Sequence, residues 1–247
     1  RVVDRTTLPQ SYHEFSNVNL SVVLKSFGSM NKTKINCLES SVFLNRAGKF
    51  ERFALPVEAQ WSPTSSINVA DFDNDGFEDL LLSQNWYSIR PDLGRLDSSA
   101  GMILLGEGQG RFHGISSGRS GLEILGECRN SIIADFNHDG RSDILATQTL
   151  GEAQLYLGQS EKRGIRLMFD SKIELAKRLG CSVNLSYSNE TSSPSRWLHS
   201  GDGVLAQCSS EAVLGFKEWP TSIQIVWSDG EMQTILVRPE IYEYTAQ

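Results

Sequence analysis

The sequence has no long apolar run and no excess of positive charge. Its apolar stretches are far shorter than the roughly 20 residues that a membrane-spanning helix needs, so we expect no membrane insertion. Lysine and arginine number 23 against 30 aspartates and glutamates, which gives a net charge of −7. A chain with that balance and no basic face is a poor partner for nucleic acid or for an anionic membrane surface.

Sequence signatures of a catalytic zinc site are also missing. The four histidines show neither HxxxH nor HxH spacing. We therefore expect no catalytic residues. Carboxylate pairs that hydrolyse glycosides can lie far apart in a sequence, so a glycan-processing enzyme stays open as an alternative.

Cysteine is scarce, with four residues and no CxxC motif, which makes a zinc ribbon or a thioredoxin-type site unlikely on spacing grounds. An even number suits disulfides in an oxidising compartment and buried thiols equally well. If a pair forms, we favour Cys181 with Cys208, because both lie in strand-like runs of the same C-terminal segment.

Targeting features are absent from the first residues, "RVVDRTTLPQ", which include neither an initiator methionine nor the apolar region of a signal peptide. This start predicts a processed product or a piece of a longer chain. Asn-x-Ser/Thr sequons occur at four positions and matter only if the source glycosylates its proteins: Asn19, Asn31, Asn184 and Asn189.

Acidic residues concentrate in two similar stretches, "ADFDNDGFEDLLLSQ" (70–84) and "ADFNHDGRSDILATQ" (134–148). Oxygen donors recur at alternate positions, and a glycine allows a sharp turn. Several hard oxygens around one centre are what Ca²⁺ requires, whereas carboxylates this close would repel one another without a cation. The sequence predicts two calcium sites, whose ligands are Asp71, Asp73, Asp75, the carbonyl of Phe77 and Asp79, and then Asp135, Asn137, Asp139, the carbonyl of Arg141 and Asp143.

These loops are not EF-hands, because position twelve is Leu82 or Ala146 and a strand follows. We expect the second loop to bind more weakly, since Asn137 removes one charge, and His138 within it to face solvent. Each site would be structural, with its coordination largely filled by the protein. Extracellular modules tolerate calcium sites with Kd on the order of 10⁻⁴–10⁻³ M, which favours a secreted, extracellular or periplasmic setting.

An internal repeat covers residues 41–158. A strand, a tight turn and a phenylalanine occur in "SVFLNRAGKF" (41–50) and "GMILLGEGQGRF" (101–112), and a third copy begins at "AQLYLGQ" (153–159). Short strands and turns that recur in this way predict blades of a β-propeller, with a β-sandwich as the alternative. Propellers close with 4–8 blades. The few blades seen here indicate that the rest has been removed or that another chain supplies it.

The repeat stops near residue 160, and further short strands follow, with "SDG" (228–230) as a hairpin turn between the last two. We therefore predict an all-β chain in three parts: a poorly patterned segment (1–40), propeller blades (41–160) and a small β domain (161–247).

A long insertion, "SQNWYSIRPDLGRLDSS" (83–99), places aromatic residues beside arginines. This composition is typical of a recognition surface, although packing of the aromatic rings over the blade is the favoured interpretation. The candidate surface residues are Trp86, Tyr87, Arg90 and Arg95. His199, near a glycine-rich turn, is interpreted as an ordinary surface histidine.

The acidic loops and their flanking residues resemble FG-GAP/VCBS repeats, the calcium-binding blades of integrin-type propellers. The stretch "LPVEAQWSPTSSINVADFDNDGFEDLLLSQNWYSIRPDLGRLDSSAGMILLGEGQGRF" is similar to the repeats of cartilage acidic protein-like secreted proteins. The later run "GCSVNLSYS…SRWLHSGDGVLAQCSSEAVLGF…SIQIVWSDGEMQTI" resembles the ASPIC/UnbV domain that follows the repeats in that family. The resemblance covers roughly residues 38–240. It departs at "GDGVLAQ" (201–207) and "WSDG" (227–230), where the family has GSGYLSQ-like and WPDG-like segments.

This resemblance implies extracellular, calcium-dependent binding or adhesion without a defined chemistry. We expect a calcium-stabilised binding module whose partner is a protein or a glycan. The alternatives are a subunit whose blades complete a propeller or larger complex with another chain, and a glycan-processing enzyme that uses the propeller face.

Overall fold

The computed structural model describes residues 11–19, 21, 22, 33–87, 94–201, 203, 205–209 and 211–247, and it divides the chain into two compact units, Arg1–Leu38 and Glu39–Gln247. In the first unit, helix α1 (Tyr12–Asn17) begins after Ser11, whose side chain accepts the N–H of Glu14 at 3.2 Å. This hydrogen bond satisfies a backbone donor that the first turn of a helix leaves without a partner. No helix among the described residues is long and apolar enough to cross a membrane.

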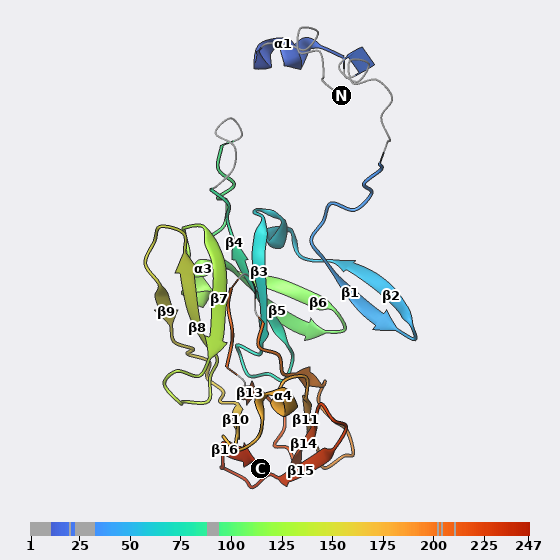
Figure 1. Ribbon diagram of the computed structural model, residues 1–247, viewed down its shortest axis with the longest axis vertical. Helices are drawn as coiled ribbons and strands as arrows, with labels where there is room; N and C mark the ends of the chain where they lie inside the picture. Colours follow the sequence, from blue (N-terminus) through green and yellow to red (C-terminus); the bar gives the residue numbers. More distant parts are fainter. Residues whose placement is uncertain are drawn as a thin grey trace. The chain divides into compact units, whose positions relative to one another are not determined.

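The second unit consists mainly of short strands in several sheets, which confirms the all-β prediction (Figure 1). None of these sheets closes into a barrel in the described part of the chain. The first is a hairpin of β1 and β2, and a short 3-10 helix, η2, leads to a four-stranded antiparallel sheet. Their bounds are Ser41–Arg46 (β1), Lys49–Ala54 (β2), Val57–Gln60 (η2), Thr64–Ala70 (β3), Asp79–Gln84 (β4), Met102–Gly108 (β5) and Arg111–Ile115 (β6).

A three-stranded sheet then repeats the first three strands of the four-stranded sheet. After the one-turn helix α3 (Ser117–Ser120), it comprises β7 (Cys128–Ala134), β8 (Asp143–Gln148) and β9 (Gln154–Tyr156). The acidic stretches connect β3 to β4 and β7 to β8. Each loop is closed by the same pairing, Ala70 opposite Asp79 and Ala134 opposite Asp143. The repeat in the sequence is therefore a repeat of the strand pairing.

The C-terminal part forms two further sheets. One has the order β13-β10-β16, in which β10 is antiparallel to β13 and parallel to β16, and the other has the order β12-β11-β14-β15. Their bounds are Ile165–Phe169 (β10), Ser182–Ser186 (β11), Arg196–Trp197 (β12), Ala212–Leu214 (β13), Ser222–Val226 (β14), Met232–Leu236 (β15) and Glu243–Ala246 (β16), with helix α4 at Leu175–Arg178.

The predicted hairpin turn between β14 and β15 is confirmed. Gly230 has a φ of +87°, which glycine adopts without strain, and its N–H donates to the carbonyl oxygen of Trp227 at 3.0 Å. The N–H of Trp227 in turn donates to the carbonyl oxygen of Glu231 at 2.8 Å. The two strands then pair from Val226 opposite Met232 onward.

Strand β4 explains how the apolar residues are distributed. Leu81 packs into one core cluster with Ile103 and Ile144, whereas Leu82 packs into another with Leu104. Because side chains alternate across a strand, β4 is covered on both faces. A strand buried on both faces has a continuous apolar run rather than an alternating one, and "DLLLSQ" has such a run. The predicted boundary after residue 160 lies inside the second compact unit, where a third cluster begins at Ile165.

The structure does not form the disulfide that we favoured. Cys181 lies buried in the C-terminal core cluster, where burial raises the pKa of its thiol to about 11. Cys208 instead reaches β7, where its sulfur accepts the N–H of Ile133 at 3.2 Å. Two strand-like runs in one segment do not determine where their side chains point, which is why the sequence argument for this pair was wrong.

Candidate metal centre

The first acidic loop is built around the carboxylate of Asp71, which directly follows β3. Its Oδ1 accepts the N–H of Asp75 at 3.0 Å, and its Oδ2 accepts the N–H of Gly76 at 2.7 Å. Gly76 has a φ of +92°, a conformation that favours glycine and turns the backbone towards this carboxylate. Asp71 thus holds the turn of the loop from the inside.

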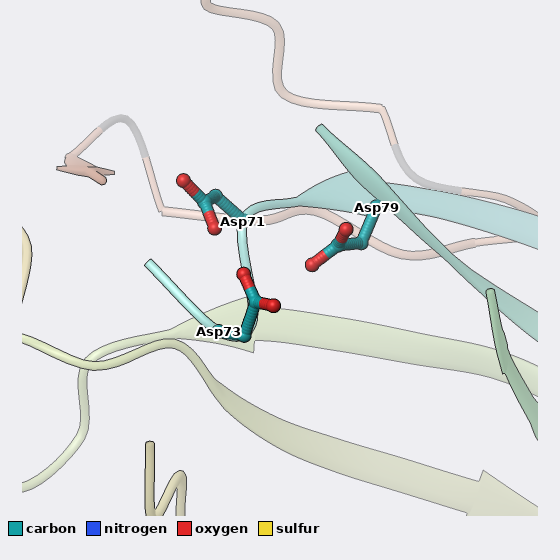
Figure 2. Close-up of side chains that lie close together, drawn as sticks. All are labelled: Asp71, Asp73 and Asp79. Atoms are coloured by element: carbon teal, nitrogen blue, oxygen red, sulfur yellow. The ribbon is translucent and has the colours of Figure 1, made fainter. Parts of the chain in front are cut away.

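Asp79 closes the same loop from the start of β4. Its Oδ2 accepts the N–H of Phe72 at 2.8 Å, and its Oδ1 accepts the N–H of Gly106 on β5 at 2.7 Å. Asp73 has a similar local role, since its Oδ1 accepts the N–H of Asp75 at 3.1 Å. One oxygen each of Asp71, Asp73 and Asp79 lies within 4.8 Å of the others, and Figure 2 shows the three carboxylates facing one another.

This arrangement is electrostatically costly without a cation. Asp71 and Asp79 are almost completely buried. Burial raises the pKa of Asp71 to about 7 and that of Asp79 to about 7, although backbone N–H donors oppose the shift. A divalent cation among the three oxygens would remove this cost. Its positive charge would stabilise the ionised carboxylates, which burial has separated from water. The residues present therefore fit a hard cation such as Ca²⁺.

Of the predicted ligands in this loop, the structure brings together Asp71, Asp73 and Asp79. Asp75 lies outside this group of three, and its Oδ1 accepts the N–H of Phe77 at 2.8 Å. The loop thus supplies a core of three converging carboxylates, with Asp75 and the carbonyl of Phe77 as the further predicted ligands.

The second acidic loop repeats the hydrogen bonds that the first loop makes to its first and last aspartates. Asp135 accepts the N–H groups of Asp139 and Gly140 at 3.0 and 2.9 Å. Asp143 accepts the N–H of Phe136 at 2.8 Å and that of Gly158, after β9, at 2.8 Å. The two loops therefore share one construction, which includes a backbone donor from within the neighbouring strand (Gly106) or from just after it (Gly158).

They differ at the third position, where Asn137 replaces the aspartate. Its Nδ2 donates to Asp139 Oδ2 at 3.0 Å, and the guanidinium of Arg141 lies 3.2 Å from the same oxygen. Among the described residues, only the first loop brings three acidic groups this close together. Asp139 Oδ1 is nevertheless buried without a hydrogen-bond partner, so the second loop retains an acceptor that a cation would satisfy.

The fourth position of each loop has a left-handed backbone, with φ of +56° at Asn74 and +59° at His138. Asparagine tolerates this conformation better than most residues. Asn74 is buried, and its Nδ2 donates to the carbonyl oxygen of Lys162 at 3.2 Å. His138 is exposed, which confirms that it does not enter the site.

Residues from β12 and from segments that flank the C-terminal strands contact the first loop, and the sequence patterns did not reveal them. The guanidinium of Arg196 on β12 binds Glu78 in a fork, at 2.7 and 2.8 Å. Ser160 donates to the carbonyl oxygen of Asp73 at 2.8 Å. A Cβ added to Gly215 would lie only 1.9 Å from Asp71 Oδ2. The one local sign of such a contact was Glu78, because this carboxylate lies outside the alternating pattern of predicted metal ligands.

The second loop is approached in the same way. Arg166, a buried residue of β10, lies 4.0 Å from Asp135 and 2.8 Å from Glu211. The N–H of Gly164 donates to the carbonyl oxygen of Gly140 at 2.8 Å. Both acidic loops therefore lie where the repeated sheets meet the C-terminal sheets.

The candidate surface residues lie away from the acidic loops. Arg95 stacks over the ring of Tyr87 at 4.7 Å from its centroid, and the Tyr87 hydroxyl donates to the carbonyl oxygen of Leu125 at 2.6 Å. Arg129 lies 5.6 Å from the centroid of the Trp86 ring. These contacts support packing of the two rings against the chain. Arg90 lies outside the described residues.

No model of a known protein family matches the chain, and no curated protein matches it significantly.

Proposed function

We propose that this chain is an extracellular or periplasmic binding or adhesion module that calcium stabilises and that has no catalytic activity. The observation that carries the proposal is the convergence of Asp71, Asp73 and Asp79, two of them buried, in a loop that joins two core strands. Its binding partner would be a protein or a glycan.

Calcium suits this loop better than magnesium does. Calcium accepts 6–8 oxygen ligands in flexible geometry, whereas magnesium demands an octahedron and keeps several waters. The loop offers carboxylates at alternate positions and the carbonyl of Phe77. The ion would hold the start of β4 against β5, where Asp79 already accepts the N–H of Gly106. We propose the same role, with lower affinity, for the second loop.

The arrangement of the strands supports the proposal that the two repeated sheets are FG-GAP/VCBS-type blades and that residues 161–247 are an ASPIC/UnbV-like domain. The order β3-β4-β5-β6 is an antiparallel meander, as in a propeller blade, and β7-β8-β9 has the same start. The acidic loop joins the first two strands in both sheets. Membership of that family is a proposal that rests on these residues alone.

Calorimetric titration with calcium, combined with thermal melts in calcium and in chelator, tests the proposal. We expect two binding events and a higher Tm in calcium. The loops also provide matched variants: Asp73→Asn should weaken the tighter event, and Asn137→Asp should strengthen the weaker one, by roughly tenfold for a change near 1.4 kcal/mol. Absence of calcium binding, with a Tm that chelator does not change, would show that the loops are solvated turns.

A second candidate function is that of a subunit whose strands are completed by another polypeptide. The β1–β2 hairpin favours it, because it is a two-stranded sheet with exposed phenylalanines, among them Phe43 and Phe50. Light scattering tests this candidate, since a stable monomer that remains soluble at high concentration would argue against obligate assembly.

A further inference from the structure

The β1–β2 hairpin is another copy of the β5–β6 hairpin. In the two registers, Phe43 opposite Arg52 corresponds to Leu104 opposite Gly114. The turns then lead to "GKF" (48–50) and "GRF" (110–112), so Phe50 corresponds to Phe112. The two hairpins thus have the same strand order. Their faces alternate in the same way up to the bulge that β5 has between Gly106 and Gly108 and that β1 lacks.

Their surroundings differ. Strand β5 pairs with β4 on one edge and with β6 on the other, whereas β1 pairs only with β2 in the part of the chain that the structure describes. Leu104 is completely buried, with 0% of its surface exposed, but the corresponding Phe43 is 57% exposed. Phe112 packs against a core cluster, while Phe50 is 73% exposed. Side chains that the repeat buries elsewhere therefore face solvent here.

The other face of the hairpin is covered only in part, because all six residues of β2 are exposed and contacts come from β1. Val42 packs against the cluster that contains Leu82 and Leu104. Leu44 lies against the turn between β5 and β6. It is so close to Gly110 that a Cβ added there would be 2.7 Å from Leu44 Cδ1. The hairpin thus contacts the four-stranded sheet through Val42 and Leu44 of β1. Its uncovered parts are the edge of β1, the face of Phe43 and strand β2.

We propose that the edge of β1 is a docking site for a third acidic-loop strand pair, similar to β3–β4, from polypeptide outside these 247 residues. This inference rests on the proposed function, because it treats the hairpin as the outer half of a blade. Edge strands commonly bind an added strand through main-chain hydrogen bonds, with specificity from alternate side chains.

The molecule itself contains two precedents for this occupant. The strand after each acidic loop pairs with the next strand, with Leu80 opposite Leu104 and Ile144 opposite Tyr156. The last aspartate of each loop also accepts a backbone N–H, from Gly106 within β5 at 2.7 Å and from Gly158, just after β9, at 2.8 Å. By the same register, an added strand would place its apolar residue opposite Phe43 and its aspartate at the N–H of Asn45.

The chain has no acidic-loop strand left for this edge. Both of its copies are already paired within their own sheets, and the sequence contains no third "DxDxDG" or "DxNxDG" stretch. Charge also favours the occupant. The hairpin carries Arg46 and Lys49, and also Arg52, which pairs with Glu39, against a single acidic residue of its own, Glu51. An acidic loop brings several carboxylates. These observations are why the proposal specifies a strand pair from elsewhere.

The first test is binding of a synthetic peptide with the sequence of residues 64–84 to the full chain in calcium. We expect saturable one-to-one binding that Phe43→Asp weakens about tenfold or more. Phe50→Asp is the matched control, because it places the same charge on another exposed phenylalanine, in β2 and away from the edge. Equal loss in both variants, or none in either, would overturn the proposal.

A fusion removes the dependence on peptide folding. A copy of residues 64–84, joined by a flexible linker ahead of Arg1 of the full chain, raises the effective concentration of the strand pair. Amide hydrogen exchange in β1 should slow about tenfold relative to the unextended chain. If the peptide does not bind and exchange in β1 is unchanged, the proposal is wrong. Self-association of the unextended chain that Phe43→Asp abolishes would assign the edge to a second copy, and would also overturn it.

Calcium titration of the unextended chain separates this inference from the proposed function. Only the docking proposal fails if the chain binds calcium but does not bind the peptide, and if amide hydrogen exchange in β1 of the fusion is not slowed. If the chain binds no calcium, the proposed function fails, whatever the peptide does.

Discussion

At the scale of single residues, Asp71 and Asp79 determine how the stability of the metal-free protein depends on pH. Burial raises the pKa of each to about 7, above the value near 4 expected in the unfolded chain. The folded, metal-free state therefore holds more protons than the unfolded state between these values. Its stability decreases as the pH rises from about 4 to about 7.

Calcium should reverse this trend, because it binds the ionised carboxylates. In chelator, we expect a higher Tm at about pH 5.5 than at about pH 7.5, and in calcium the gain in Tm should be larger at the higher pH. Thermal melts under the four conditions check this. A Tm that changes with pH in the same direction and by the same amount in calcium and in chelator would contradict it.

Cys181 gives a second prediction at this scale. Its thiol is buried in the C-terminal core, and burial raises its pKa to about 11, so very little reactive thiolate is present at neutral pH. We expect it to resist alkylation in the native protein and to react fully after unfolding, as measured by mass spectrometry. Recovery of a peptide in which Cys181 is joined to Cys208 would show that the structure has the wrong cysteine chemistry.

At the scale of an element, β5 is fitted to the first acidic loop at one glycine. A Cβ on Gly106 would lie 2.2 Å from the carbonyl oxygen of Glu78, and the N–H of Gly106 donates to Asp79. Gly106→Ala should therefore shift β5 away from the loop, which would cost about 1–3 kcal/mol in unfolding free energy and weaken calcium binding. Chemical denaturation and calorimetry measure the two effects.

Two other glycines provide the comparison. Gly158→Ala should affect the second loop in the same way, because its Cβ would lie 2.7 Å from the carbonyl oxygen of Ser142. Gly118→Ala, in α3, should be nearly neutral, since a Cβ there meets nothing within 4 Å. If all three variants lose the same stability, close contact between strand and loop is not the cause.

At the scale of the whole second unit, arginines link the C-terminal sheets to the acidic loops. Arg196 is mostly buried and binds both oxygens of Glu78, so Arg196→Met leaves a partly buried carboxylate without its partner. We expect a loss of about 2 kcal/mol, since hydrogen bonds to charged groups are worth about 1.5–3 kcal/mol. Arg52→Met, at the more exposed pair with Glu39, should cost less than about 1 kcal/mol.

A double-mutant cycle with Glu78→Gln isolates the interaction from other effects of the substitution. The coupling energy between positions 78 and 196 should exceed that between positions 39 and 52. If it does not, the Arg196–Glu78 ion pair does not stabilise the contact between the C-terminal sheets and the first acidic loop. Calcium titration of Arg196→Met then shows whether the link also supports the first loop.

Much of the local structure was predictable from the sequence. The two acidic loops, the turn at Ser228–Gly230 and the all-β class follow from residue types at short spacings, and these act through neighbouring backbone atoms. The hydrogen bonds from Gly76 and Gly140 to the first aspartate of each loop are of this kind, since they join residues five positions apart. The calcium that these loops are proposed to bind stays a prediction.

Contacts between distant segments were not predictable. Arg196 meets Glu78 across 118 positions, and Cys208 meets Ile133 across 75. Neither pair leaves a pattern in the sequence, because the partners are brought together only when separate sheets pack. The sequence by itself thus determined the strands, the turns and the composition of the acidic loops. The tertiary structure alone decided which carboxylates converge, which thiols are buried and which strand edge lacks a neighbour among the described residues, because each depends on packing between elements far apart in the chain.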